Sequence, residues 1–599
     1  MAVYPPRGKV EKKQTWNAES VFKNQKAWQA ELDSILADLD SVKRFQGRLA
    51  EGPATLLEAL SAYDKLFMRA ERVYMYAGFA YAVDTADQQA AGAVGKASSM
   101  FGQAAAAVAF LSPEILAIGK DKLDNWMKQD TRLAAYKHSF DNLFRKHEHI
   151  RSGEVEEVLG MLADPLSGPQ NTATMITSAD FKFEPAVSSK GTKLMVTQSS
   201  IHEILASPDR PARQSGWNHY MDRHVEFSNT LASNLSTSIK TNVFSMRVHK
   251  HESTLAASLF ENNIPVEVFY NLIDTFKRHL PVWHRYFELR RRALGLSSIA
   301  YHDMWAPLAR RNIKITFKEA VDMICEGLQP MGAEYTDIIR RGCLQERWVD
   351  SAPNKGKQNG AFSYGSPGTY PFVMMSFTGD VGSMSTLAHE LGHSMHSYLT
   401  WKNQPFAYTE YSLFVAEVAS NFHQAMVRAN LLNTTTNRNF QIALIEEAMS
   451  NFFRYFFQMP TLARFELEVH QRAEKGQALT AESMMDLMAD LFTEGFGPRV
   501  KIDRPRVGMV WSTFNHLFSD YYVYQYATGI SGAHALSGRI LRGEPNAVED
   551  YLGFLRSGSS AYPLEVLKRA GVDLASPKPV EETFAVMEEY IDRLERLLR

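Results

Sequence analysis

The sequence GSMSTLAHELGHSMH, residues 382–396, is the most informative stretch of this 599-residue chain. It contains the pattern H-E-x-x-H. Residues four apart lie one turn apart on the same face of a helix, about 6 Å from each other, so His389 and His393 can direct both imidazoles at one zinc ion. Glu390 projects beside them, where it can take a proton from water activated by the metal. We therefore predict a catalytic zinc site on a helix.

The same helix also carries a third histidine. Ser383 or Ser385 is available to cap the start of the helix. His396 lies seven residues after His389, on the same face but about 10.5 Å further along the axis. Because zinc–nitrogen bonds are about 2 Å long, these two histidines cannot both bind one ion from a regular helix. We expect His396 to lie near the metal rather than on it, and the third ligand to come from another segment.

The best candidate for the third ligand is Glu417, in the sequence SLFVAEVAS at residues 412–420. A carboxylate within an apolar helical run is costly to bury unless a cation or strong hydrogen-bond donors meet it. Glu410 is the alternative, but the sequence YTEY at residues 408–411 predicts an exposed loop. Two histidines and one glutamate would leave a fourth position open, as in catalytic zinc sites.

A cluster of aromatic and polar residues follows in FNHLFSDYYVYQYATG, residues 514–529. Tyr522 and Tyr526 are four apart, which places them on one face of a helix, and His516 precedes them by about two turns. Peptide hydrolysis on zinc passes through a tetrahedral oxyanion that tyrosine or histidine donors can stabilise. A tyrosine stripe with this spacing is also typical of core packing, so the pattern alone leaves both roles open.

Most of the remaining sequence predicts helix, with two strand-like islands. The first has segments at residues 181–187 and 193–198. The second contains the glycine-bounded run 370–379, just before the zinc segment. Its residues 370–377 are expected either to pair with an extended substrate or to form a structural hairpin. A proline-rich break suggests a boundary near residue 205. We therefore expect an N-terminal helical domain, 1–205, with a short β-hairpin near its end, and a domain at 206–599 that carries the zinc site.

Composition excludes several classes of protein. The net charge of 65 − 67 = −2 provides no basic field for nucleic acid. Two cysteines cannot form a disulfide scaffold or a cysteine-rich zinc finger. No secretory signal is evident, and the longest notable apolar run, residues 104–111, is far shorter than the roughly 20 residues that span a bilayer. We expect a soluble, cytoplasmic protein without a nucleic-acid or membrane partner.

Together these segments resemble the M3 family of zinc metallopeptidases, on the oligoendopeptidase F side. The resemblance is strongest over residues 350–535 and extends over nearly all the chain. It rests on the strand before the helix, on HELGHSMH at 389–396, on VAEVAS at 415–420 and on YVYQYATG at 522–529.

The resemblance implies roles for particular residues. The metal ligands that it implies, for one zinc ion per chain, are His389, His393 and Glu417. It implies that Glu390 is the general base.

It also implies that a histidine and a tyrosine from the downstream segment donate hydrogen bonds in the transition state. His516 matches the histidine. Tyr522 fits the Tyr-x-Tyr-x-Tyr-Ala-Thr-Gly run, while the spacing from His516 leaves Tyr521 as the alternative. Tyr526, Tyr521 and His396 are the further residues expected to contact substrate.

The fold implied by the resemblance is mainly α: a large, two-lobed helical body with a small β-sheet beside the H-E-x-x-H helix, enclosing a deep substrate channel. The implied activity is hydrolysis of internal bonds in short, unstructured peptides. One alternative is a zinc carboxypeptidase of another helical H-E-x-x-H family, but no arginine near these motifs clearly provides for a free C-terminal carboxylate. The other is a non-catalytic, zinc-bearing peptide-binding protein. The sequence does not decide between monomer and homodimer.

Overall fold

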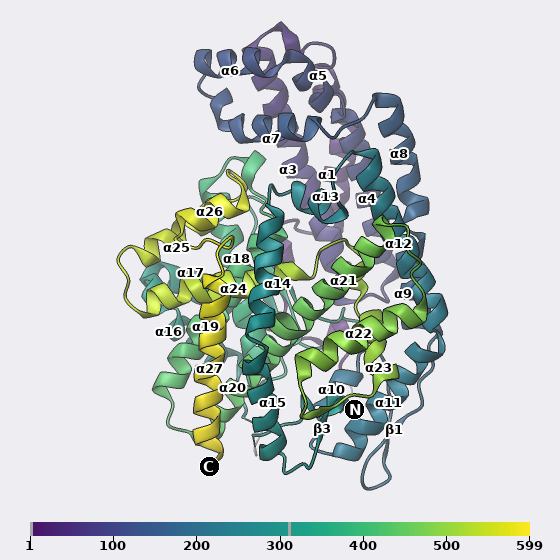
Figure 1. The fold of residues 1–599 in the computed structure, drawn as a ribbon. Coiled ribbons are helices and arrows are strands. Elements are labelled where there is room, and N and C mark those ends of the chain that lie inside the picture. Colours follow the sequence, from purple (N-terminus) through teal and green to yellow (C-terminus); the bar gives the residue numbers. More distant parts are fainter. Residues whose placement is uncertain (1–3, 310–312) are drawn as a thin grey trace. The chain divides into compact units, whose positions relative to one another are not determined.

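The computed structural model describes residues 4–309 and 313–599, and these are mainly helical, as predicted (Figure 1). The chain divides into two compact units. Unit 1 consists of Met1–Glu148, Lys314–Asn430 and Arg539–Gly571, and unit 2 consists of His149–Ile313, Leu431–Gly538 and Val572–Arg599.

The chain passes from one unit to the other five times, after residues 148, 313, 430, 538 and 571. The divisions after residues 430 and 538 fall within helices α19 (Leu413–Thr434) and α24 (Tyr524–Leu541). The boundary expected near residue 205 lies inside unit 2, at the end of α10 (Ile201–Leu205). The division into domains at that residue stays a prediction.

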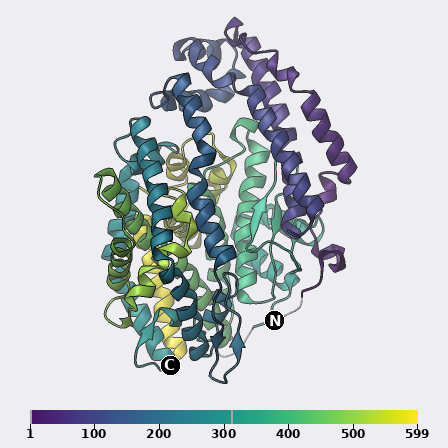
Figure 2. The same ribbon diagram turned by 90° about the vertical axis from the view of Figure 1, so that its right-hand side faces the viewer.

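Unit 1 contains the long N-terminal helices and a small sheet. Its other helices are α1 (Gln25–Ala37), α2 (Asp40–Lys43), α3 (Pro53–Val83), α4 (Gln88–Val108), α5 (Leu111–Ile118), α6 (Lys120–Gln129), α7 (Lys137–His147), α16 (Phe317–Gly327), α17 (Ala333–Leu344), α18 (Val381–Asn403), α25 (Ala547–Arg556) and α26 (Pro563–Arg569). α3 and α4 run side by side in Figures 1 and 2. Small buried residues of α4, such as Ala93 and Ala97, allow this close packing.

A three-stranded sheet lies beside α18 in unit 1. Its strands are β4 (Val349–Asp350), β5 (Phe362–Tyr364) and β6 (Phe372–Met374), in the order β4-β6-β5, with β6 parallel to β4 and antiparallel to β5. β5 and β6 both contact α18, which confirms the predicted sheet beside the zinc helix. The expected pairing of residues 370–377 with substrate is wrong for β6, because β6 has a partner strand on each side. The edge strands of the sheet are β4 and β5.

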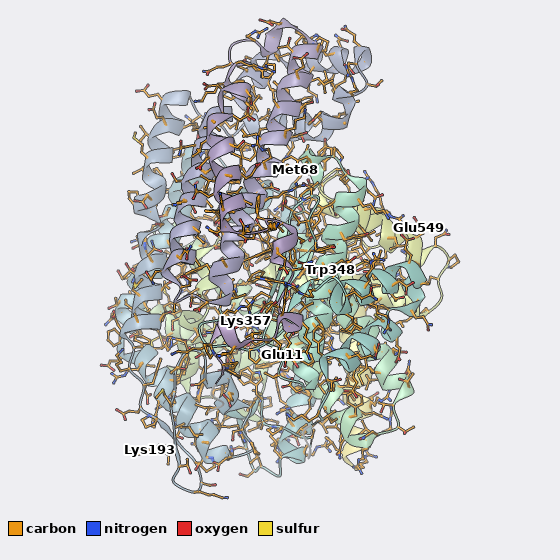
Figure 3. The ribbon with its side chains drawn as sticks, turned by 180° about the vertical axis from the view of Figure 1, so that it is seen from behind. Glu11, Met68, Lys193, Trp348, Lys357 and Glu549 are labelled. Carbon is orange, nitrogen blue, oxygen red and sulfur yellow. The ribbon has the colours of Figure 1, made fainter. Side chains whose placement is uncertain are left out.

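The sheet is tied to the N-terminal segment by a buried ion cluster. Asp350 of β4 is fully buried and accepts hydrogen bonds from Lys357 at 2.7 Å and from Arg7 at 2.9 Å. Two cations meet this carboxylate because an unpaired buried charge would be costly. Lys357 is labelled in Figure 3.

Unit 2 is also helical. Its further helices are α8 (Gly153–Leu166), α9 (Gly168–Met175), α11 (Arg210–Glu226), α12 (Ser228–Val248), α13 (Thr254–Phe260), α14 (Val266–Arg278), α15 (Leu280–Ala293), α20 (Arg438–Phe452), α21 (Met459–Glu474), α22 (Ala481–Phe496), α23 (Arg504–Gly508) and α27 (Lys578–Leu598). Its strands are β1 (Ala186–Val187), β2 (Lys193–Leu194), β3 (Ile299–Ala300) and β7 (Val500–Lys501). β1 and β2 form the predicted hairpin, but its strands are shorter than predicted. Pro185, which lacks an N–H group, precedes β1, and the Thr197 amide bonds to Ser200 in a turn after β2.

One apolar helical stretch of unit 1 is longer than the sequence analysis expected. Among the described residues, Gln88–Ile118 is long and apolar enough, by length and composition, to cross a membrane, and 28% of its most apolar window is buried. Alanines before the run 104–111 and the residues ILAI at 115–118 after it extend the apolar stretch. A single helix of this kind is weak evidence for a membrane span, and the absence of a membrane partner stays a prediction.

Candidate metal centre

The H-E-x-x-H helix, α18, begins with a reciprocal capping arrangement. Asp380 Oδ1 accepts a hydrogen bond from the Ser383 amide at 2.7 Å, and Ser383 Oγ accepts one from the Asp380 amide at 3.1 Å. The predicted serine cap is therefore wrong in detail. Asp380 is the N-cap residue, and Ser383 accepts the second hydrogen bond of the capping box, from the Asp380 amide. Ser385 is buried and accepts a hydrogen bond from Gln424 of α19 instead of capping α18.

A glycine lets α18 and α19 approach each other closely. A β-carbon at Gly392 would lie 2.5 Å from the Ala419 carbonyl oxygen and 2.6 Å from the Ser420 Cα. These distances are shorter than any real contact of a β-carbon, so a larger residue would push the two helices apart. Gly392 therefore allows α19 to bring its glutamate to the two histidines of α18.

The three predicted ligands lie together. Among the described residues, ligand atoms of His389, His393 and Glu417 lie within 4.8 Å of one another. His389 Nε2 is 3.5 Å from Glu417 Oε2. Two ligand atoms on a tetrahedral zinc ion are about 3.4 Å apart when both bonds are about 2.1 Å long. The side chains present therefore fit a zinc ion, and the alternative, Glu410, is not in this group.

Burial sets the protonation of the neighbouring groups. It lowers the pKa of His393 to about 4, an effect that Glu417 opposes and His389 reinforces, so this imidazole is in the neutral form that binds metal. Glu390 is 5% exposed, and burial raises its pKa to about 7. Its buried Oε2 has no hydrogen-bond partner among the described residues. A cation on the adjacent ligands would favour the ionised form of Glu390 and offset the free-energy cost of burying its charge.

Gln424 of α19 orients His389. Its side-chain oxygen lies 3.2 Å from His389 Nδ1, and its amide nitrogen donates to Ser385 Oγ at 2.8 Å. Because that oxygen can only accept, Nδ1 carries the hydrogen and Nε2, which faces Glu417, is free for a metal. Sequence reasoning missed Gln424. Gln424 could have been found from the sequence, because a polar residue seven positions after Glu417 lies on the same face of the helix.

We expect Gln424→Met to weaken zinc binding by about 10–100-fold, because the methionine has no oxygen to hold the His389 tautomer. Gln424→Glu, which keeps the acceptor, should bind zinc nearly as well as the wild type. The measurement is competition with a chelator of known zinc affinity. The control is Gln404→Met, which removes a similar bond, to the Arg556 carbonyl at 2.7 Å. Equal losses in the Gln424→Met and Gln404→Met variants would contradict a specific role.

His396 lies in the core of unit 1. It is 1% exposed, and its ring stacks on Tyr411 with 3.7 Å between ring centroids. The Tyr411 hydroxyl in turn lies 2.7 Å from Ser397 Oγ. This placement agrees with the expectation that His396 lies off the metal, and it disfavours the expected contact with substrate.

His516, Tyr522 and Tyr526 form a local cluster in unit 2. His516 belongs to a 3₁₀ turn, Asn515–Phe518, and α24 begins only at Tyr524, so the expected single helix through all three residues is wrong. They nevertheless meet: the ring centroids of His516 and Tyr522 are 5.5 Å apart, and the Tyr526 hydroxyl donates to the Tyr522 hydroxyl at 3.3 Å. Burial lowers the pKa of His516, and the charge of Arg454 lowers it further.

The backbone separates the roles of the two adjacent tyrosines. Tyr521 has a φ of +48°, a conformation rare for a bulky residue, and its amide donates to Glu466 at 2.7 Å. Its side chain is 1% exposed, with its hydroxyl 3.0 Å from Thr254 Oγ1. Tyr522 is partly exposed and lies beside His516. The geometry thus favours Tyr522 over Tyr521 as the donor, and it disfavours a substrate contact for Tyr521.

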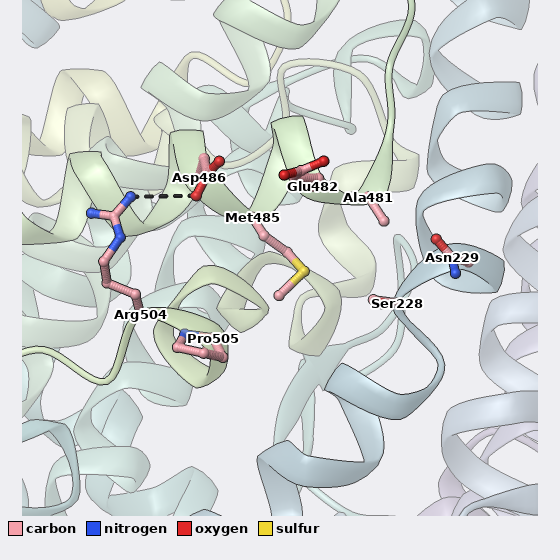
Figure 4. A pocket seen from close by; sticks show the side chains of 8 residues that line it. All are labelled: Ser228, Asn229, Ala481, Glu482, Met485, Asp486, Arg504 and Pro505. Atoms are coloured by element: carbon pink, nitrogen blue, oxygen red, sulfur yellow. Dashed lines mark hydrogen bonds and ion pairs between the residues drawn. The ribbon is translucent and has the colours of Figure 1, made fainter.

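A surface pocket of about 310 Å³ in unit 2 lies apart from these clusters in the sequence. Figure 4 shows its lining, with Met485 in the middle and Arg504 paired to Asp486 at one side. It is lined by Ser228, Asn229, Ala481, Glu482, Met485, Asp486, Arg504 and Pro505. None of these is a predicted site residue, and we assign the pocket no role.

Comparisons with known proteins agree with this geometry. Residues 204–586 match the profile of "Peptidase family M3", and residues 114–183 match that of "Oligopeptidase F". The oligopeptidase PepF of Bacillus subtilis (strain 168) is 37% identical, over 99% of this chain and 88% of the relative. Group B oligopeptidase PepB of Streptococcus agalactiae serotype III (strain NEM316) is 32% identical, over 99% of this chain and 98% of the relative. The crystal structure of oligoendopeptidase-F from Enterococcus faecium has a TM-score of 0.74 and 28% identity, covering 96% of this chain and 99% of that chain.

The fold and the match over more than half of the sequence show that the chain belongs to peptidase family M3. Within that family it is a metallo-oligopeptidase of the oligoendopeptidase F type, which hydrolyses peptides with the help of a catalytic metal. The zinc carboxypeptidase and the non-catalytic binding protein are not favoured.

Proposed function

We propose that the metal is zinc, one ion per chain, and that His389, His393 and Glu417 hold it. The observation that carries this proposal is the approach of their ligand atoms to within 4.8 Å of one another. Zinc, when bound, polarises the scissile carbonyl and lowers the pKa of a water molecule to about 7. Two imidazoles and one carboxylate leave a position for such a water.

Glu390 is the general base in this proposal. Glu390 directly follows His389 and precedes His393 by three residues. Its side chain is 5% exposed and has one oxygen without a partner among the described residues. It accepts the proton of the attacking water and then delivers it to the leaving nitrogen. Both transfers need a carboxylate held in place and shielded from bulk solvent, which burial provides.

His516 and Tyr522 are proposed to donate hydrogen bonds to the oxyanion that develops on the scissile carbonyl. Their rings lie close together, and Tyr526 holds the Tyr522 hydroxyl. Both side chains are partly exposed, in contrast to the buried Tyr521.

We expect Tyr522→Phe to lower kcat by about 10²–10³-fold, because it removes one donor to the oxyanion, while metal content is unchanged. Tyr521→Phe is the matched comparison, since it removes a neighbouring hydroxyl that bonds to Thr254. Steady-state kinetics on one quenched peptide compare the two. If Tyr521→Phe causes the larger loss in kcat, the assignment passes to Tyr521.

The proposed substrates are short, unstructured peptides cut at internal bonds in the cytoplasm. Strand β5 has a free edge in its sheet, and we propose that the extended peptide pairs there. The test is an internally quenched peptide blocked at both ends, with its products identified by mass spectrometry. Internal cleavage that stops on chelation and returns with zinc supports the proposal. Cleavage confined to peptides with a free C-terminus would overturn it.

A further inference from the structure

A short π-helical turn in unit 2, Phe453–Gln458, carries an arginine that has no counterion in the described part of the chain. This turn links α20 to α21. Arg454 is partly buried, and among the described residues it makes no hydrogen bond or ion pair with the protein. Its Nε is shielded from solvent and lacks an acceptor. In contrast to Arg454, both arginines of the following helix, α21, have counterions: Arg464 pairs with Glu494 at 2.5 Å, and Arg472 pairs with Glu468 at 2.8 Å.

Ring contacts connect Arg454 to the proposed oxyanion donors. The guanidinium carbon is 5.8 Å from the centroid of the Tyr455 ring, which stacks on Tyr526 at 5.0 Å. Tyr526 bonds to Tyr522 and lies 5.9 Å from His516. The pKa of His516 is lowered partly by the charge of Arg454, and no carboxylate contributes to that shift. His516 Nδ1 is buried without a partner too. Two buried nitrogen atoms of this cluster, Arg454 Nε and His516 Nδ1, therefore lack a hydrogen-bond partner among the described residues.

We propose that Arg454 binds a carboxylate of the peptide substrate. A partly buried arginine without a counterion is costly unless an anion arrives to meet it. Its planar fork binds a carboxylate through two parallel hydrogen bonds, and the Tyr455 ring lies beside the guanidinium. π-Helical turns occur frequently at functional sites, and here the turn sets the position of Arg454. The inference rests on the proposed function, because it places substrate at the cluster of His516 and Tyr522.

The carboxylate has two sources in a peptide: the C-terminal α-carboxylate, or the side chain of an aspartate or glutamate. Both offer the same pair of oxygens to the guanidinium. A set of quenched peptides of one length separates them. One peptide has a free C-terminus and no acidic side chain, a second has a C-terminal amide and one glutamate, and a third has an amide and glutamine in place of glutamate, so that it carries no carboxylate.

We expect Arg454→Met to lower kcat/KM by about tenfold or more for whichever acidic peptide the arginine recognises, because a charge-assisted pair is lost. The peptide without a carboxylate should be cut equally well by the wild type and the variant. Arg454→Lys, which keeps the charge but not the fork, should recover part of the selectivity. The acidic peptide that responds identifies the source of the carboxylate.

Arg472→Met is the control, since Glu468 already neutralises that arginine. The proposal is overturned if Arg454→Met lowers kcat/KM equally for all three peptides. Binding of the uncut peptides to folded, zinc-loaded Glu390→Gln protein, with and without Arg454→Met, gives a readout independent of turnover. The peptide without a carboxylate tests the proposed function separately. If His516→Ala and Tyr522→Phe leave its cleavage unchanged, the oxyanion assignment fails, whatever Arg454 does.

Discussion

Glu390→Gln is expected to lower kcat on an internally quenched peptide by about 10²–10⁴-fold, the range that general acid–base catalysis contributes. The amide is nearly isosteric with the carboxylate but cannot accept a proton from water. Glu390 is not among the three grouped ligands, so the variant should still bind one metal ion per chain. The measurements are steady-state kinetics and metal content of the same preparation.

Glu549→Gln provides the control for this prediction. Glu549 lies on the surface of unit 1, labelled in Figure 3, and pairs with Arg556 at 2.5 Å. Exposed pairs contribute little, so this variant should keep wild-type activity and melting temperature. Near-normal activity in Glu390→Gln would exclude Glu390 as the base. Loss of metal from Glu390→Gln would show instead that this carboxylate helps to hold the ion.

Glu417→Ala is expected to abolish activity by releasing the metal. It removes one of three protein ligands and leaves two histidines of the same helix to hold the ion. The loss of zinc affinity should exceed the roughly 10–100-fold that an outer hydrogen bond to a ligand is worth. Chelator competition measures the affinity, and added zinc at high concentration should restore little activity.

Glu410→Ala is the matched comparison, because Glu410 was the other candidate ligand in the sequence. It lies outside the ligand group, so its removal should leave metal content unchanged. If Glu410→Ala loses metal while Glu417→Ala keeps it, the third ligand has been assigned to the wrong glutamate. Circular dichroism of both variants checks that the helices persist.

The metal centre could be predicted from the sequence because its signals are local. His389 and His393 share one helix, and helical geometry fixes their spacing without any knowledge of the fold. Glu417 could be found because a carboxylate in an apolar helical run requires a partner. The small sheet beside α18 was also visible, since glycines bound a β-rich segment.

Other features depend on neighbours that the sequence does not reveal. The pattern of a strand does not say whether it is central or at an edge, so the sequence could not show that β6 lies between β4 and β5. Gly392 and Gln424 gain their importance only when α19 lies against α18. Arg454 is far from His516 in sequence, and only the folded unit 2 shows that its Nε is buried without a partner among the described residues.

The five passages of the chain between the two units have a practical consequence for proteolysis and for the expression of fragments. Each unit is made of three segments, so a single proteolytic nick in a connecting segment frees neither of them. A fragment that ends at residue 205 would contain an incomplete part of each unit, and we expect it to be insoluble when produced alone. Two complementary fragments would have to find each other and fold together before any enzyme could form.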